Sequence, residues 1–83
     1  MPRLIKLEPR PEYQLFVEFA DGVSGVIDLS RRLFGAMFEP LRDPEVFRAA
    51  QIDEFGAPCW PNGADLAPDA LYLQLKNRTP NVA

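Results

Sequence analysis

The chain has 83 residues, 47% of them hydrophobic, with 9 Lys and Arg, 12 Asp and Glu, one Cys and no His, for a net charge of −3. This length fits one small domain, and the absence of His and of a second Cys excludes Ser–His and Cys–His catalysis, imidazole-based zinc sites and an internal disulfide. The acidic balance argues against binding to duplex nucleic acid. Because there is no apolar run long enough to span a membrane and no signal peptide at the start, we expect a cytoplasmic protein.

The first residues alternate as in a half-buried strand. In residues 4–7 we expect Ile5 and Leu7 to face the core while their polar neighbours point to solvent. Pro9 and Pro11 then remove two backbone donors, which predicts that the strand ends there in a connection.

Residues 13–28 have the pattern of a β-hairpin. A three-residue loop over 20–22, closed by Gly22 in the left-handed region, makes one face uniformly apolar, whereas a two-residue turn mixes polar and apolar partners. The predicted cross-strand pairs are Phe19 with Val23, Val17 with Gly25, and Leu15 with Ile27. On the other face Phe16 pairs with Val26, and such an apolar pair marks an interface if no helix covers it.

Short helical segments follow the hairpin. Residues 29–35 carry Leu at a spacing of four, with Ser30 as a candidate cap and a terminal Gly, which predicts a short helix. Residues 38–42 are predicted to form an irregular or 3₁₀ turn. Asp43 is a helix N-cap followed by Pro at the first helical position, and this helix should end by Ala50.

The second half predicts one more hairpin and one more helix. Residues 51–53 and 57–60 flank a Gly-containing turn, and the strand that contains Pro58 should lie at an edge or pair on one side only. The helix is predicted from Pro68 to about Lys76. Its apolar stripe is expected to comprise Ala67, Leu71 and Leu75.

The order β-β-β-α-β-β-α indicates an α+β fold with a mainly antiparallel sheet and short helices packed on one face. We expect a single domain over residues 1–76 and a frayed C-terminal tail over 77–83, which has almost nothing to bury.

The chain resembles the bacterial domain-of-unknown-function family 2442 from about Leu4 to Tyr72. The matching residues are Tyr13-x-Leu15-x-Val17-x-Phe19-x-Asp21-Gly22, Asp28-Leu29, Phe38-x-x-Leu41-x-Asp43 with Phe47, and Trp60-Pro61-Asn62-Gly63-x-Asp65-Leu66-x-Pro68-Asp69-x-Leu71-Tyr72. The resemblance implies a small cytoplasmic bacterial protein with a partner-binding or regulatory role and no established catalytic activity. Some members of the family precede a fused helix-turn-helix, and others are encoded beside a second small protein in apparent toxin–antitoxin pairs.

The block that begins at Trp60 has two interpretations. In the functional one, Trp60 and Tyr72 form the walls of a pocket. Polar contacts to a ligand or partner then come from Asn62, Asp65 and Asp69. In the structural one, which we favour, Pro-Asn-Gly is a turn, Asp65 accepts hydrogen bonds from backbone amides ahead of the helix, and Trp60 closes the core.

The remaining polar residues do not form a pattern typical of catalysis. The Asp residues lack the spacing of a cation-binding loop, so we expect no metal site, no cofactor and no enzymatic activity. Cys59 is expected to be a small buried hydrophobic residue, because no His is present to activate it. The pair Arg31-Arg32 is interpreted as a solvated surface; contact with nucleic acid or an acidic partner is the alternative.

These observations predict a non-enzymatic protein-interaction or regulatory module, and the resemblance implies the antitoxin-like member of a two-gene pair as its specific form. The expected partner is another small protein encoded nearby, together with homo-oligomerisation through the open sheet face at Phe16 and Val26. Membrane association and direct nucleic-acid binding are not expected. The alternative is a small-ligand sensor that uses a pocket near Trp60 and Tyr72.

Overall fold

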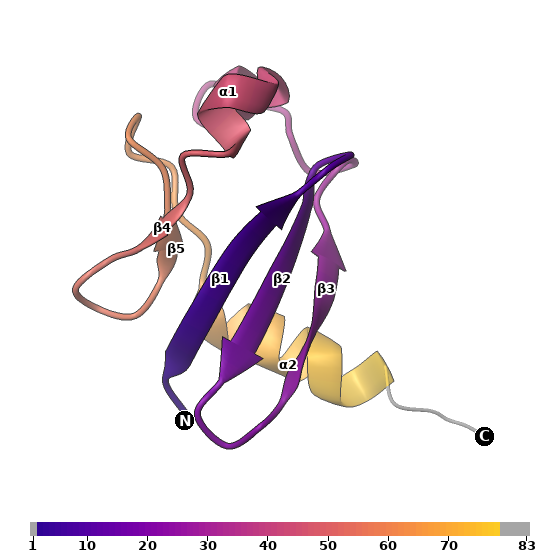
Figure 1. Ribbon diagram of the computed structural model, residues 1–83. Coiled ribbons are helices and arrows are strands. Elements are labelled where there is room, and N and C mark those ends of the chain that lie inside the picture. Colours follow the sequence, from indigo (N-terminus) through magenta and orange to yellow (C-terminus); the bar gives the residue numbers. More distant parts are fainter. Residues whose placement is uncertain (1, 79–83) are drawn as a thin grey trace.

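The computed structural model describes residues 2–78. It confirms the predicted α+β class: a three-stranded antiparallel sheet in the order β1-β2-β3, a two-stranded antiparallel sheet, and short helices (Figure 1). The elements are β1 (Leu4–Arg10), β2 (Gln14–Phe19), β3 (Ser24–Asp28), the 3₁₀ helix η1 (Glu39–Arg42), α1 (Pro44–Phe47), β4 (Gln51–Ile52), β5 (Pro58–Cys59) and α2 (Pro68–Arg78). Helix α2 lies behind the three-stranded sheet, while α1 lies beyond the end where β1 connects to β2 (Figure 1).

The register of the β2–β3 hairpin is the predicted one. Leu15 pairs with Ile27 and Val17 with Gly25, and Gly22 has a φ of +96° in the three-residue loop. The Gly22 amide donates to the Phe19 carbonyl at 2.9 Å and closes this loop. Burial of the apolar face selects this register, because a slip of one residue would turn that face to solvent.

Strand β1 differs from the prediction in phase and in length. An irregularity in its pairing with β2 between Leu4 and Lys6 shifts the alternation, so that Leu4 is buried and Ile5 is 55% exposed. Leu7 packs partly against the core, as expected. The strand also continues through Pro9 to Arg10, because β1 is an edge strand of this sheet and a proline nitrogen that points away from β2 costs no ladder bond.

The helix predicted for residues 29–35 does not form. The Asp28 carboxylate accepts a hydrogen bond from the Ser30 amide at 2.8 Å, and the Arg32 amide donates to the Leu29 carbonyl at 2.9 Å. The segment is therefore an Asx turn followed by an irregular loop, and Asp28, not Ser30, provides the side-chain bond. A segment of seven residues cannot offset the free-energy cost of helix nucleation unless a capping bond or tertiary packing stabilises the helix.

The next elements form as predicted. η1 occupies the predicted 3₁₀ segment, and Asp43 caps α1 by accepting from the Glu45 amide at 2.9 Å. Strands β4 and β5 form the second hairpin. Strand β5 is an edge strand of this two-stranded sheet, as predicted, but its side away from β4 is not free. There the Pro58 carbonyl accepts from the Leu66 amide at 2.9 Å, and Cys59 forms an isolated bridge with Asp65.

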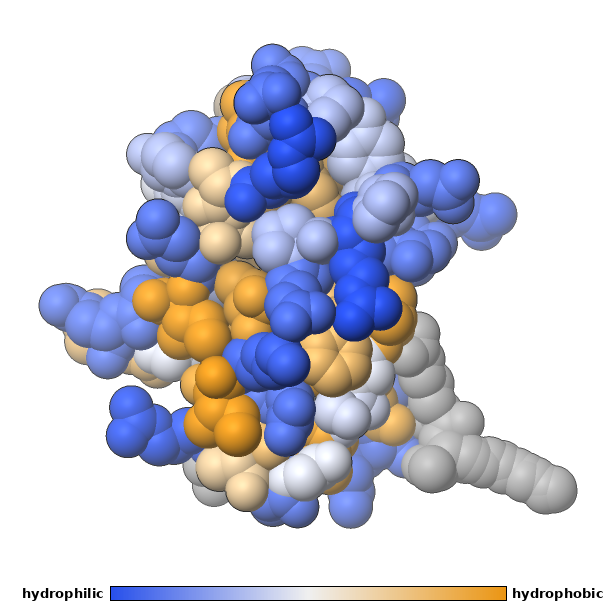
Figure 2. Space-filling model, viewed as in Figure 1, coloured by the Kyte–Doolittle hydropathy of each residue, from blue (hydrophilic) through white to orange (hydrophobic). Residues whose placement is uncertain are grey.

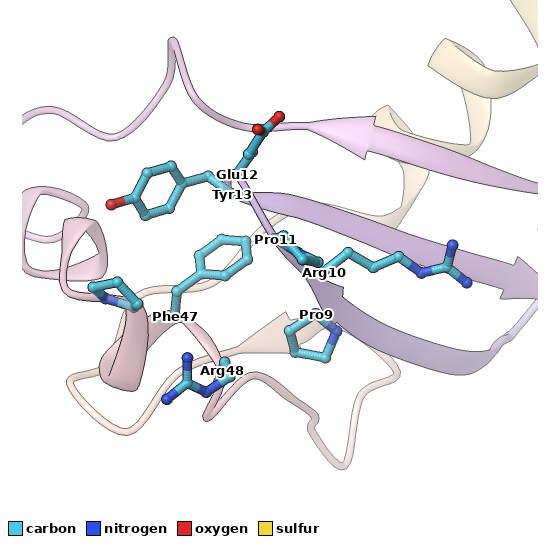
Figure 3. Close-up of a pocket in the computed structure, with 8 residues that line it drawn as sticks. Pro9, Arg10, Pro11, Glu12, Tyr13, Phe47 and Arg48 are labelled. Atoms are coloured by element: carbon cyan, nitrogen blue, oxygen red, sulfur yellow. The ribbon is translucent and has the colours of Figure 1, made fainter.

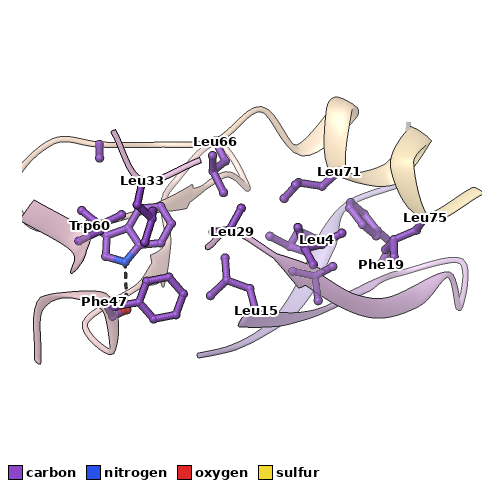
Figure 4. Close-up of a cluster of buried hydrophobic side chains, with 14 residues drawn as sticks. Leu4, Leu15, Phe19, Leu29, Leu33, Phe47, Trp60, Leu66, Leu71 and Leu75 are labelled. Carbon is purple, nitrogen blue, oxygen red and sulfur yellow. Dashed lines mark hydrogen bonds between the residues drawn. The ribbon is translucent and has the colours of Figure 1, made fainter. Parts of the chain in front are cut away.

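Helix α2 covers the apolar face of the sheet. Leu71 and Leu75 are buried, but Ala67 is exposed because it precedes the helix and does not share its periodicity. The helix reaches Arg78, beyond its predicted end, and the rest of the predicted tail, residues 79–83, lies outside the described residues. The buried cluster (Figure 4) comprises Leu4, Leu15, Val17, Phe19, Ile27, Leu29, Leu33, Leu41, Phe47, Trp60, Ala64, Leu66, Leu71 and Leu75.

Candidate functional site

Trp60 is a core residue. Its side chain is 3% exposed, its ring centroid lies 6.0 Å from that of Phe47, and its Nε1 donates to the Phe47 carbonyl at 3.0 Å (Figure 4). The indole thus satisfies its single polar group inside the protein. This geometry matches the structural interpretation of Trp60.

Tyr72 contacts a different part of the core from Trp60. Its ring packs edge-to-face against Phe19 with centroids 5.0 Å apart, and its hydroxyl donates to Asp21 Oδ2 at 2.6 Å. Figure 4 shows Phe19 at the opposite end of the buried cluster from Trp60. The hollow of about 280 Å³ next to Trp60 is lined by residues of the β4–β5 region and not by Tyr72. The structure therefore does not bring the two proposed pocket walls together.

Asn62 and Asp65 lie in the turn that follows Trp60. The Asn62 side chain accepts from the Ala64 amide at 3.1 Å and donates to the Met37 carbonyl at 2.9 Å, so it closes this turn and attaches it to a distant loop. The turn is thus stabilised by Asn62, where the sequence suggested Asp65. Asp65 is exposed and contributes to the strand bridge with Cys59.

Phe16 and Val26 pair across β2 and β3 on the sheet face away from α2, and both are half-buried. Lys6 Nζ and the Arg10 guanidinium carbon lie 5.8 Å and 5.0 Å from the Phe16 ring centroid. Both cations also form ion pairs with Glu8, at 3.4 Å and 3.2 Å. Side chains of the neighbouring strand therefore cover much of Phe16 by cation–π contacts.

Strand β1 adds a charged row to this sheet face, and the row consists of Lys6, Glu8 and Arg10. Figure 2 shows hydrophilic and hydrophobic side chains interspersed over this face. Hydrogen bonds from Arg10 and then from Lys6 lower the pKa of Glu8, which keeps this carboxylate ionised. The predicted open sheet face is therefore a mixed surface and not a purely apolar one.

A hollow of about 360 Å³ lies between the β1–β2 turn and α1 (Figure 3). The residues that line it are Pro9, Arg10, Pro11, Glu12, Tyr13, Pro44, Phe47 and Arg48. In Figure 3 the rings of Tyr13 and Phe47 lie next to each other, while Arg10 extends away from them along the sheet. The hollow is at the small end of the range for ligand-sized pockets and is walled by prolines and aromatic rings.

The turn that forms one wall has an unusual backbone. Glu12 and Tyr13 have φ angles of +65° and +61°, a conformation that non-glycine residues rarely adopt and that costs about 1–3 kcal/mol per residue. Three contacts hold Tyr13 there. Its hydroxyl donates to the Arg42 carbonyl, its carbonyl accepts from the Leu29 amide at 2.9 Å, and its ring packs edge-to-face on Phe47 at 5.5 Å.

Sequence reasoning missed this hollow. The prolines predict only a connection, and positive φ angles are not expected at Glu or Tyr. The available signal was the spacing Pro9-x-Pro11-x-Tyr13, which places two rigid rings and an aromatic ring in one short turn. That signal does not identify the opposite wall, which comes from Pro44 and Phe47 on α1.

The described residues 2–78 contain no candidate metal-binding cluster. No group of three or more His, Cys, Asp or Glu side chains in that range is placed to hold an ion. Cys59 is half-buried, and burial together with the nearby charges of Asp53 and Asp65 raises the pKa of its thiol. Nor does this part of the chain contain a helix long and apolar enough to cross a membrane.

Comparison with known proteins gives one match. A family model described as "Protein of unknown function (DUF2442)" matches residues 4–77, which is nearly the whole chain. No curated protein and no solved structure matches it.

Proposed function

The chain belongs to the DUF2442 family of proteins of unknown function, and we propose that it is a non-enzymatic module that binds another protein. The hollow between the β1–β2 turn and α1 is the proposed binding site, and an apolar side chain of the partner is its proposed occupant. The observation that supports this most is the strained turn. Tyr13 is held by three contacts in a costly conformation, and its position forms a wall of the hollow.

Two polar groups of the walls are already bonded within the protein, and this favours a protein partner over a small metabolite. The Tyr13 hydroxyl is bonded to Arg42 and the Phe47 carbonyl to Trp60, so these groups are not available to orient a small ligand. Small-molecule sites rely on a few well-placed polar groups, whereas the anchor residue of a protein needs mainly a rigid apolar recess.

The specific form of this proposal is a regulatory role, as the antitoxin-like member of a two-gene pair. Its support is the sequence resemblance alone, and the partner would be a small protein encoded next to this one. Self-association through the sheet face is a further proposal. Phe16 and Val26 support it, but the charged row on β1 predicts a weak association that salt disrupts.

Co-purification with a single-site control tests the binding proposal. Affinity-tagged protein is co-expressed with the product of the adjacent gene, and we expect the two to elute together. Pro44→Arg places a charge on the wall of the hollow and should weaken the complex at least tenfold, while Gln74→Arg adds the same charge to the exposed side of α2 and should not. Equal loss in both variants, or free monomer in the wild type, would contradict the proposal.

The second candidate function is a small-ligand sensor, and the volume of the hollow is the observation in its favour. Trp60 can report on this site, because its ring lies 6.0 Å from Phe47, which lines the hollow. A saturable change of Trp60 fluorescence with a metabolite, lost in Pro44→Arg, would support the sensor function. No change across a metabolite collection would argue against it.

A further inference from the structure

The loop between β3 and η1 carries exposed cations and exposed apolar side chains within seven residues. Arg31 and Arg32 are exposed, Phe34 is 67% exposed and Met37 is 45% exposed. We propose that this segment, residues 31–37, is a docking loop for an acidic segment of another protein. In this arrangement carboxylates of the partner pair with the two arginines, and apolar side chains of the partner cover Phe34 and Met37.

Charge is the first argument. Residues 29–38 contain two arginines and no acidic residue, whereas the whole chain has a net charge of −3. Among the described residues, no carboxylate lies within ion-pairing distance of either guanidinium. The pKa of Asp28 is lowered first by hydrogen bonds from the Ser30 amide and side chain, and the charge of Arg31 ranks last among the causes. By contrast, Arg10 and Arg48 are already paired with glutamates.

Pre-organisation is the second argument. Although the docking loop has no regular secondary structure, side-chain bonds attach it to the rest of the protein. Arg42 Nε donates to the Leu33 carbonyl at 2.7 Å, and Asn62 Nδ2 donates to the Met37 carbonyl at 2.9 Å. A fixed loop loses less entropy on binding, and this lowers the cost of presenting its side chains to a partner.

A small recess beside the loop provides the third argument. It has a volume of about 60 Å³, and its lining comprises Leu29, Arg32, Leu33, Phe38 and Leu66. Apolar side chains form its walls, and Arg32 brings a cation to it. Such a recess accepts one small apolar side chain while a neighbouring carboxylate of the same partner reaches Arg32.

The same observations favour a protein over a lipid surface or a nucleic acid. Two arginines contribute only about 1 kcal/mol each at an anionic membrane, and the net negative charge of the chain opposes that approach. Nucleic-acid binding depends on many phosphate contacts, for which two cations are too few. An acidic protein segment needs opposite charges only near its own carboxylates, because charges further away than the screening length of about 8 Å at physiological salt contribute little.

Titration followed by amide NMR shifts tests the proposal on the intact chain. The probe is the peptide Gly-Asp-Leu-Glu-Asp-Leu-Phe-Glu-Gly, and its neutral counterpart carries Asn and Gln in place of Asp and Glu. We expect the acidic peptide to shift the amides of residues 30–38 and to bind at least about tenfold more tightly than the neutral one at low salt, because two ion pairs are added. Raising the salt concentration should reduce this difference.

Two double variants and a matched control complete the test. The double variant Arg31→Gln with Arg32→Gln should weaken binding about tenfold, and Phe34→Ser with Met37→Ser should weaken it comparably. Arg3→Gln with Lys76→Gln removes the same number of charges from exposed positions outside both the docking loop and the hollow, and should leave binding unchanged. Folding of each variant is checked by its amide spectrum.

The proposal would be overturned by equal binding of the neutral peptide or by no shift at millimolar acidic peptide. It would also be overturned by binding of phosphatidylserine vesicles or single-stranded DNA in place of the peptide, with the same dependence on Arg31 and Arg32. Shifts confined to the hollow at Tyr13 and Phe47 would also overturn it, while they would support the function proposed above. The two proposals can therefore fail independently.

Discussion

The hydroxyl of Tyr72 donates to Asp21 Oδ2 at 2.6 Å, and this bond joins α2 to the β2–β3 loop across 51 residues of sequence. This hydrogen bond shifts the pKa of both side chains: it lowers the pKa of Asp21 and raises the pKa of Tyr72. The neutral phenol and the ionised carboxylate therefore stabilise each other in the folded protein.

We expect Tyr72→Phe to lower the melting temperature at neutral pH, because Asp21 loses its donor. The lowered pKa of Asp21 stabilises the fold above the usual Asp pKa of about 3.9, and this is lost as pH falls through the folded-state value. The raised pKa of Tyr72 stabilises the fold below about pH 10, and this is lost as pH rises through its folded-state value. Melting curves of both proteins should therefore converge at acidic and strongly alkaline pH; a constant difference would contradict this coupling.

Glu12→Gly should stabilise the protein. The φ of +65° at Glu12 is strained for Glu and accessible to Gly, and relief of this strain exceeds the added entropy of the unfolded chain by about 1 kcal/mol. This corresponds to a rise of about 4–8 °C in melting temperature for a domain of this size. Glu18→Gly, within β2, is the control and should destabilise; a loss of stability in both variants would show that the turn is unstrained.

Trp60→Phe should lower the free energy of unfolding by about 2 kcal/mol, because it removes the bond to the Phe47 carbonyl and part of a buried ring. Urea unfolding followed by circular dichroism measures the change. Phe55→Ser is the comparison: Phe55 is 82% exposed, so its replacement should change stability by less than about 0.5 kcal/mol. A small effect at Trp60 would mean that the indole is not part of the core.

Gly22→Ala should cost about 1 kcal/mol, because the φ of +96° is unfavourable for Ala although the added methyl group meets no atom within 4 Å. Gly22→Asn should cost less, since Asn tolerates the left-handed region better than Ala. Equal effects of the two substitutions in thermal unfolding would indicate a steric cause in place of a backbone one.

Cys59 should react slowly with iodoacetamide at pH 8, because burial raises the pKa of its thiol and keeps the thiolate fraction low. Asp65→Asn should accelerate the reaction by removing a negative charge that contributes to this shift. Asp69→Asn removes an exposed carboxylate elsewhere and should leave the rate unchanged. Mass spectrometry of the alkylated protein measures both rates.

The sequence pattern predicted the elements that depend mainly on interactions between residues close together in the sequence. The β2–β3 register followed from burial of one face, and the start of α1 followed from Asp43 as its cap. The phase of β1 did not follow, because the pairing irregularity next to Leu4 depends on the partner strand. Residues 29–35 have a helical spacing, but the side-chain bond of Asp28 favours a turn.

The candidate sites were harder to predict, since each depends on residues distant in sequence. Trp60 and Tyr72 belong to one sequence block, yet one packs on Phe47 and the other on Phe19. One wall of the hollow is formed by Tyr13, which a contact with the distant Arg42 helps to hold in a strained conformation. No periodicity in the sequence reports such a contact.

The position of α2 at the end of the described chain has a consequence during synthesis. The apolar face of β2 and β3 is translated first, and Leu71 and Leu75, which help to bury it, emerge roughly fifty residues later. Until residues 68–78 leave the ribosome, Phe19 lacks the Tyr72 ring that packs against it. The nascent hairpin therefore exposes part of its apolar face until α2 is available, and slow translation of the last helix would prolong this exposure and favour aggregation.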